Sequence, residues 1–205
     1  MTYYERRLPH WQPEGKILFV TWRLWGSLPA AAWTKLRAPV DRRAALAAKA
    51  RGQSRSFGSP RHHVSAGAYF AALDQALERA PGGPRWLKDE RVAGAVVEAL
   101  RKGDRELAHY HLHAFVVMPN HVHALLEPLI PPVLSLKTIK GTAARSANTI
   151  LGRTGRPFWQ EESFDHWVRS GAEFERIRSY IERNPVRAGL ATKPQDWPWS
   201  SACQP

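Results

Sequence analysis

The stretch Val116 to Pro128 reads VVMPNHVHALLEP and carries two histidines, His121 and His123, on either side of one apolar residue. Successive side chains of a β-strand alternate between its two faces, so both imidazoles are expected on one face and Val122 on the other. The segment 118–120 just before them, Met-Pro-Asn, is typical of a turn between two strands. The pattern therefore predicts a β-hairpin that presents a pair of imidazoles.

This pair of imidazoles has two interpretations. Two neutral imidazoles side by side make up half of a binding site for a divalent metal ion. An edge strand that carries two solvated histidines would give the same pattern. The hairpin alone leaves both interpretations open.

The composition indicates an anionic partner. The chain has 205 residues and a formal net charge of +12, and its pI is about 10.4. Such an excess of positive charge favours nucleic acid as the partner, with an anionic membrane surface as the rival. The length suits one domain with a real core. We expect a single catalytic domain over 1–205, with a helical or loop insertion at about 30–65, where Ala, Arg, Gly, Ser and Pro gather.

The N-terminus and the cysteine content bear on location. No stretch is long and apolar enough to span a bilayer, and the first residues, MTYYERRLPHW, lack the apolar core of a signal peptide. The single cysteine, Cys203, excludes an intrachain disulfide and a thiolate zinc cluster. We therefore expect a cytoplasmic protein without a membrane partner.

The remaining segments predict the fold class. Strands are expected at 17–24, at 107–117, from about His121 to Pro128, and within 158–168, chiefly at 164–168. Helices are expected at 66–80, 88–102, 133–151 and 170–184. This order predicts an α+β protein with a ferredoxin-like antiparallel sheet of four to five strands. Its helices are expected on one face of the sheet, in addition to the helical insertion. The aromatic tail 197–202 is expected to pack back on the body.

The last predicted helix carries two further candidate residues. Ser170 and Glu173 fit a capping box at its start. Pro185 disfavours a helical conformation at the residue before it, so the helix is expected to end or kink at Asn184. Tyr180 lies four residues before Asn184, which places both side chains on one helix face.

Asn184 and Tyr180 would add a third metal ligand and a nucleophile to the pair of histidines. The amide oxygen of Asn184 would be a hard third ligand, and a mixed set of nitrogen and oxygen ligands suits Mg or Mn. A phenol at Tyr180 would then lie near the metal, where it could attack a phosphodiester that the ion polarises. The competing interpretations are a packing role for Tyr180 and a cap or turn role for Asn184.

Three blocks of the sequence resemble a known family. They are MPNHVHALLEP at 118–128, FWQEESFDHWVRS at 158–170 and YIERNPVRAGL at 180–190. In this order and spacing they resemble the REP-associated tyrosine transposases, which are single-tyrosine members of the His-hydrophobic-His nuclease superfamily. The segment 3–29 also resembles one subgroup of this family, whereas the long segment 33–65 departs from its compact members.

The resemblance implies an activity and a set of site residues. It implies metal-dependent nicking and strand transfer on single-stranded DNA with REP-like hairpins, through a 5′-phosphotyrosine. Tyr180 matches the family's nucleophile, His121 and His123 match its metal pair, and Asn184 matches its third ligand. Asp165 and His166 match a polar pair in the second block, but the resemblance gives that pair no role.

Basic side chains near these blocks are candidate contacts to DNA phosphates. Arg183 and Arg187 flank the predicted nucleophile, and Lys137, Lys140 and Arg145 lie on the preceding helix. Each is also compatible with an ordinary surface charge. The oligomeric state, a monomer or a homodimer, stays open.

Two alternative functions compete with the transposase interpretation. One is a domesticated protein that binds hairpin DNA without cleaving it. The other is an unrelated metal hydrolase in which Asp165 or Glu127 assists the histidines. A small substrate would not need so basic a surface, so the hydrolase ranks last.

Overall fold

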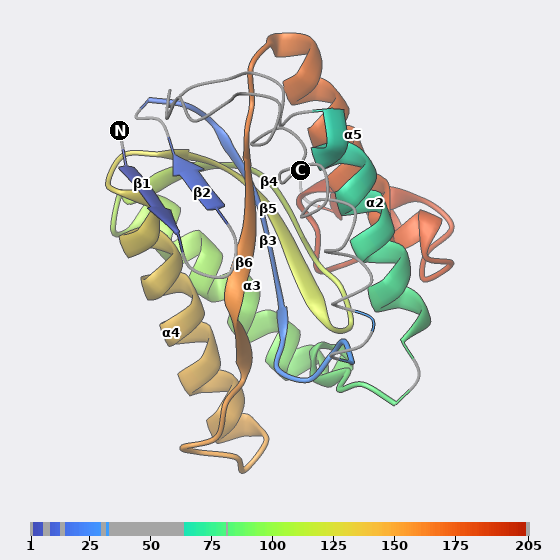
Figure 1. Ribbon diagram of the computed structural model, residues 1–205. Helices are drawn as coiled ribbons and strands as arrows, with labels where there is room; N and C mark the ends of the chain where they lie inside the picture. The colour runs from blue at the N-terminus through green and yellow to red at the C-terminus, as the bar shows by residue number, and fades with distance from the viewer. Residues whose placement is uncertain are drawn as a thin grey trace, which may run out of the picture. The chain divides into compact units, whose positions relative to one another are not determined.

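The structure is a computed structural model that describes residues 2–5, 9–12, 15–29, 32, 64–80 and 82–203 (Figure 1). It divides into two compact units, Met1–Trp25 with Pro84–Pro205, and Gly26–Gly83. In the smaller unit the described helix is α2 (Val64–Arg79). The predicted insertion at about 30–65 lies almost wholly outside the described residues. The single catalytic domain over 1–205 stays a prediction.

A four-stranded antiparallel sheet forms the centre of the larger unit. Its strands are β3 (Leu18–Leu24), β4 (Tyr110–Val117), β5 (His121–Pro128) and β6 (Trp159–Trp167), in the spatial order β4-β5-β3-β6. The first and third of these strands in the chain thus lie in the middle, and the second and fourth lie at the edges. This is the strand order of a ferredoxin-like sheet, and it confirms the predicted α+β class. A separate two-stranded ladder, β1 (Thr2–Glu5) with β2 (Pro9–Gln12), precedes it.

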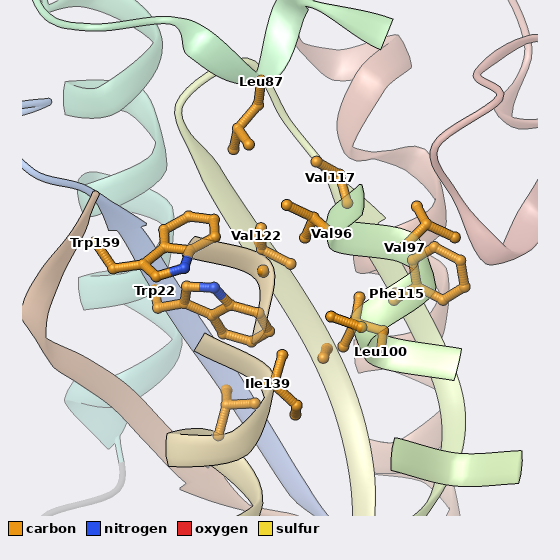
Figure 2. Close-up of a cluster of buried hydrophobic side chains, with 14 of the residues drawn as sticks. Trp22, Leu87, Val96, Val97, Leu100, Phe115, Val117, Val122, Ile139 and Trp159 are labelled. Carbon is orange, nitrogen blue, oxygen red and sulfur yellow. The ribbon is translucent and has the colours of Figure 1, made fainter. Parts of the chain in front are cut away.

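The helices α3 (Glu90–Arg105) and α4 (Pro132–Ile150) cover one face of the sheet. Trp22 and Val122 point into the apolar layer beneath them, where Val96 of α3 and Ile139 of α4 also lie (Figure 2). The rings of Trp22 and Trp159 meet edge to face, with 6.2 Å between their centres. This layer is the core of the unit, and its burial of Val122 decides which face of β5 points away from it.

The helix α5 (Gly171–Arg187) packs on the opposite face of the sheet (Figure 1). The Tyr180 ring lies 6.1 Å from that of Phe19, and the Phe174 ring lies 5.2 Å from the imidazole of His113. The prediction of helices on one face therefore holds for α3 and α4, whereas α5 covers the other face. Its own apolar residues Ile177 and Ile181 are buried, as expected of a helix that packs one apolar side on a sheet.

The two ends of α5 follow the predicted signals only in part. Ser170 caps the helix, because its Oγ accepts a hydrogen bond from the Glu173 N–H at 3.2 Å. The helix does not end at Asn184, as one of the two predicted outcomes had it, because it continues through Pro185 to Arg187. Proline removes one backbone hydrogen bond, and the burial of its ring at this position compensates for that loss. Asn184 is consequently a residue of the helix.

The C-terminal residues close the outer edge of β4. The Val117 N–H donates to the Trp199 carbonyl at 2.8 Å, and the Trp197 indole N–H donates to the Val117 carbonyl at 3.0 Å. Covering an edge strand in this way protects it from pairing with another chain. The predicted return of the 197–202 tail to the body is therefore confirmed. Of the helices in the described ranges, none has both the length and the apolar character needed to cross a bilayer.

A glycine in α3, Gly103, makes room for the buried Tyr110 side chain of β4. The buried Tyr110 hydroxyl donates to the Leu100 carbonyl at 2.7 Å, and burial raises the pKa of this phenol so that it stays a neutral donor. A Cβ atom at Gly103 would overlap the Tyr110 ring. The glycine is therefore required by packing and not by its backbone angles.

We expect Gly103→Ala to lower the free energy of unfolding by about 1–3 kcal/mol, because the displaced Tyr110 ring cannot keep its place and its hydrogen bond. Urea denaturation monitored by circular dichroism measures this change. Gly141→Ala is the matched control in α4, where a Cβ atom meets nothing within 4 Å. The control should stabilise the protein by about 0.4–1 kcal/mol. Equal effects at the two glycines would contradict the packing role.

Candidate active site

The two histidines of β5 lie together on the face that α5 covers. His121 is 1% exposed and His123 is fully buried, and their ring centres are 4.8 Å apart. Because β5 lies between β4 and β3, the alternative of an edge strand with solvated histidines is contradicted. Two imidazoles are thus held side by side, out of contact with solvent.

A polar partner orients each imidazole. The Nδ1 atom of His121 lies 2.7 Å from the amide oxygen of Asn120, and the Nδ1 atom of His123 lies 2.7 Å from the Thr21 hydroxyl. An amide oxygen can only accept, so this contact keeps the proton of His121 on Nδ1 and its lone pair on Nε2. Metal-binding histidines in proteins are commonly oriented by such contacts.

Asn184 reaches the second imidazole from α5. Its amide nitrogen lies 3.4 Å from Nε2 of His123, although the two residues are 61 positions apart in the sequence. This contact fits a His123 lone pair on Nε2, with the Nδ1–H donating to the Thr21 hydroxyl oxygen. Rotation of the Asn184 side-chain amide by 180° would place its oxygen, in place of its nitrogen, next to Nε2 of His123.

The resulting set of donors can accommodate a divalent metal ion. It consists of the Nε2 atoms of two neighbouring imidazoles and, when the amide is turned, the oxygen of Asn184 beside His123. Nitrogen and oxygen ligands of this kind fit several divalent ions, Mg and Mn among them. The chemistry of the donors therefore agrees with the metal that the sequence predicts, while the identity of the ion stays open.

Tyr180 lies one helical turn before Asn184 and beside the same histidine. Its ring centre is 5.9 Å from that of His123, and the ring of Phe19 contacts both of these residues. The guanidinium carbon of Arg187 lies 4.8 Å from the centre of the Tyr180 ring. Tyr180 is only partly buried. These contacts hold a phenol at the border between the buried histidines and solvent.

The five predicted DNA-contact residues lie on two helices, α4 and α5, on opposite faces of the sheet. Arg183 and Arg187 are exposed on α5, and the Arg187 guanidinium lies over the Tyr180 ring. Lys137 and Arg145 are exposed on α4, which covers the opposite face of the sheet from the histidines. Lys140 is partly buried, and its ammonium donates at 2.9 Å to the backbone carbonyls of 160 and 161 in β6. Lys140 thus connects α4 to the sheet, and Arg187 is the predicted DNA contact that lies against Tyr180.

The polar pair of the second block is divided between the two faces of the sheet. Asp165 lies opposite Val20 in the ladder and therefore shares the face of the apolar core. His166 lies opposite Phe19, on the α5 face, and its Nε2 is 3.1 Å from the Glu173 carboxylate. Burial opposes the charge of Glu173, but hydrogen bonds from the Arg169 N–H and from His166 outweigh it and lower the pKa of this carboxyl. His166 thus attaches the start of α5 to β6.

The carboxylates of the hydrolase alternative do not join the histidines in this arrangement. Asp165 is on the other face of the sheet from His121 and His123. Glu127 is on the same face but makes a contact of 3.0 Å with His113. The geometry therefore offers an amide oxygen, and neither of these two carboxylates, as the third donor from this unit.

Sequence reasoning did not find Thr21 or Asn120. Thr21 lies directly opposite His123 in the β3–β5 ladder. A correct register between the first strand and the hairpin would have identified it, because residues that face one another across two strands interact. The sequence predicts only a turn role for Asn120, although its place next to His121 puts its amide within reach of the ring.

Comparisons with known proteins find a similarity in structure. No family model matches the chain, and no curated protein matches it. A solved structure described as a REP-associated tyrosine transposase bound to a REP hairpin is similar over 98% of this chain and 82% of that chain. The identity is 19% and the TM-score is 0.48.

We expect Thr21→Val to weaken the binding of Mn²⁺ by about 10- to 100-fold, because the His123 ring loses the partner that orients it. Calorimetric titration of the purified protein with MnCl₂ measures the affinity. Valine has the shape of threonine, and Thr21→Ser, which keeps the hydroxyl, is the matched control and should bind nearly as well as the wild type. Unchanged affinity in the valine variant would show that the hydroxyl does not serve a metal site.

Proposed function

We propose that the protein is a metal-dependent, single-tyrosine DNA nuclease and strand transferase of the REP-associated tyrosine transposase type. The observation that carries this proposal is the proximity of Tyr180 and Asn184 on α5 to His121 and His123 on β5. The resemblance in the sequence assigns roles to these same residues. The strongly basic composition supports DNA as the substrate.

The reaction transfers a phosphoryl group between two oxygen atoms. The phenolic oxygen of Tyr180 attacks the phosphorus of the scissile phosphodiester, and the bond from phosphorus to the 3′ oxygen breaks. The phenol loses its proton and the departing 3′ oxygen gains one, which leaves a 5′-phosphotyrosine and a free 3′-hydroxyl. Attack by another 3′-hydroxyl reverses these changes and joins two strands.

The residues around Tyr180 have different roles in this proposal. His121, His123 and Asn184 would hold the ion, which when bound would neutralise charge on the phosphate. Thr21 and Asn120 orient the two imidazole rings. Single-stranded DNA with a hairpin is the proposed substrate class, which comes from the resemblance in the sequence.

We expect Tyr180→Phe to abolish strand cleavage and the covalent adduct, because it removes the attacking oxygen and leaves the ring contacts in place. Labelled single-stranded hairpin DNA from the flanks of the gene is incubated with protein, with and without Mg²⁺ or Mn²⁺, and resolved on a denaturing gel. DNA binding, measured by fluorescence anisotropy, should stay close to that of the wild type. Nicking by the variant at the wild-type rate would refute Tyr180 as the nucleophile. Hairpin binding by the wild type without any adduct would instead favour the non-cleaving alternative.

The two faces of the sheet should differ in their contribution to DNA binding. We expect Arg183→Gln to weaken binding and to reduce the slope of log K against log salt by about 1, because one phosphate contact is lost. Arg145→Gln removes the same charge from an exposed helical site on the opposite face and is the matched control. Anisotropy titrations over a series of salt concentrations measure both slopes. An equal loss in the two variants would mean that only net charge matters.

A further inference from the structure

Trp25, directly after β3, leaves a large aromatic ring in solvent. Its side chain is 49% exposed. Among the residues whose side chains the structure describes, no other Phe, Tyr or Trp is exposed. A single exposed apolar residue is common on protein surfaces and does not by itself indicate a site. Two features of its surroundings set Trp25 apart, the histidine pair and a basic turn.

The backbone places Trp25 at the end of the sheet where His121 lies. Arg23, two residues earlier, is opposite His121 in the β3–β5 ladder, and the Leu24 N–H donates to the Asn120 carbonyl at 2.8 Å. A strand rises about 3.4 Å per residue, so Trp25 lies about 7 Å along the chain from the position that faces His121. Successive phosphates of a stacked DNA strand are about 3.4 Å apart along its axis. A strand with a phosphodiester at the histidines therefore reaches Trp25 within a few nucleotides.

A basic turn, 153–156, lies next to Trp25. The Trp25 N–H donates to the Phe158 carbonyl at 2.8 Å, and the turn ends two residues before Phe158. A hydrogen bond of 3.0 Å from the Arg156 N–H to the Arg153 carbonyl closes this turn. Trp25 and the turn belong to the same compact unit. Their proximity therefore follows from backbone contacts.

The two arginines of the turn have different surroundings. The guanidinium carbon of Arg153 lies 3.6 Å from the centre of the Trp86 ring, which stacks on the Phe158 ring with 5.6 Å between their centres. Arg156 is exposed, and within the described part of the chain its interactions are those of its backbone N–H and carbonyl. The stretch 129–160 contains no Asp or Glu. The Arg156 guanidinium thus remains available to an anion.

These two side chains fit two parts of one DNA strand. An indole ring in solvent stacks on the flat face of any unpaired base. A guanidinium binds phosphate oxygens through parallel N–H groups. The strand that the proposed function places at the histidines offers both groups.

We propose that Trp25 and Arg156 form a second DNA contact beside the histidine site, in which Trp25 stacks on an unpaired base and Arg156 binds a phosphate. The contact rests on the proposed function for its substrate. It adds two residues to which neither the sequence motifs nor the resemblance gives a role. Stacking depends little on the identity of the base, so the contact holds the strand in place without selecting its sequence.

The stacking is tested by binding alone, with Tyr180→Phe in all proteins and no added metal. Labelled single-stranded hairpin DNA from the flanks of the gene carries an abasic nucleotide at each unpaired position in turn, and anisotropy gives its affinity. We expect one position at which loss of the base weakens binding about tenfold in the parent. Trp25→Ala should weaken binding of intact DNA by about the same factor and lose nothing more at that position, because the two changes remove one contact. Trp25→Phe should keep most of the affinity, and Leu134→Ala, at a site of α4 that is also 49% exposed, should keep all of it.

The dependence on salt separates the two contacts. Arg156→Gln should weaken binding and reduce the slope of log K against log salt by about 1. Trp25→Ala should leave this slope unchanged, because stacking releases no counterions. Arg145→Gln, on α4, is the matched control for the loss of charge. An unchanged slope in Arg156→Gln, or an equal reduction in Arg145→Gln, would remove Arg156 from the contact.

Three results would overturn the role of Trp25. They are parent-like DNA binding by Trp25→Ala, a parent without any sensitive abasic position, and losses that add fully at every position. Trp25→Gln replaces the alanine variant if that one does not fold, as judged by circular dichroism. Self-association of the parent that Trp25→Ala abolishes, with DNA binding unchanged, would make Trp25 part of an interface between two copies. A missing adduct with the abasic effect intact would refute nucleophilic attack by Tyr180 and leave Trp25 in place.

Discussion

The packing of Val122 in the apolar layer under α3 and α4 decides how the rest of the unit is arranged. Its side chain is fully buried there. Because strand side chains alternate, this burial turns His121 and His123 to the opposite face. A slip by one residue would put two imidazoles into an apolar layer without hydrogen-bond partners, at a large cost in free energy. The candidate site therefore depends on ordinary hydrophobic packing on the far side of the sheet.

A second constraint fixes the rotation of α5 on the histidine face. Ile177 and Ile181 are buried, while the contact between Glu173 and His166 attaches the first turn to β6. A helix held by an apolar stripe and by a polar contact at one end has little freedom to rotate about its axis. The side chains of Tyr180 and Asn184, one turn apart, are consequently directed at His123. The same fixed geometry keeps a phenol, an amide and an imidazole close together.

Local patterns predicted much of the fold, and the misses have physical causes. The turn at 118–120 and the cap at Ser170 were predicted correctly, because both depend on the conformational preferences of a few neighbouring residues. The strand β6 begins at Trp159 and not at 164, since the polar run 160–163 hides its alternation. The helix α5 passes through Pro185, because burial in the tertiary structure outweighs one lost hydrogen bond. The Lys140 ammonium donates to a backbone carbonyl of β6, and the sequence of its own helix does not indicate this contact.

The sequence by itself determined the α+β class, the pair of imidazoles on one strand face, and a tyrosine and an asparagine on one helix face. Each of these follows from a short-range period of two or of 3.6 residues along the chain. Only the tertiary structure decided that the helix face meets the strand face, and that Thr21 and Arg23 lie opposite the histidines. Contacts of this second kind depend on strand register and on the packing of segments far apart in the chain. No local pattern encodes them, because they arise when the apolar layers on both faces of the sheet are buried together.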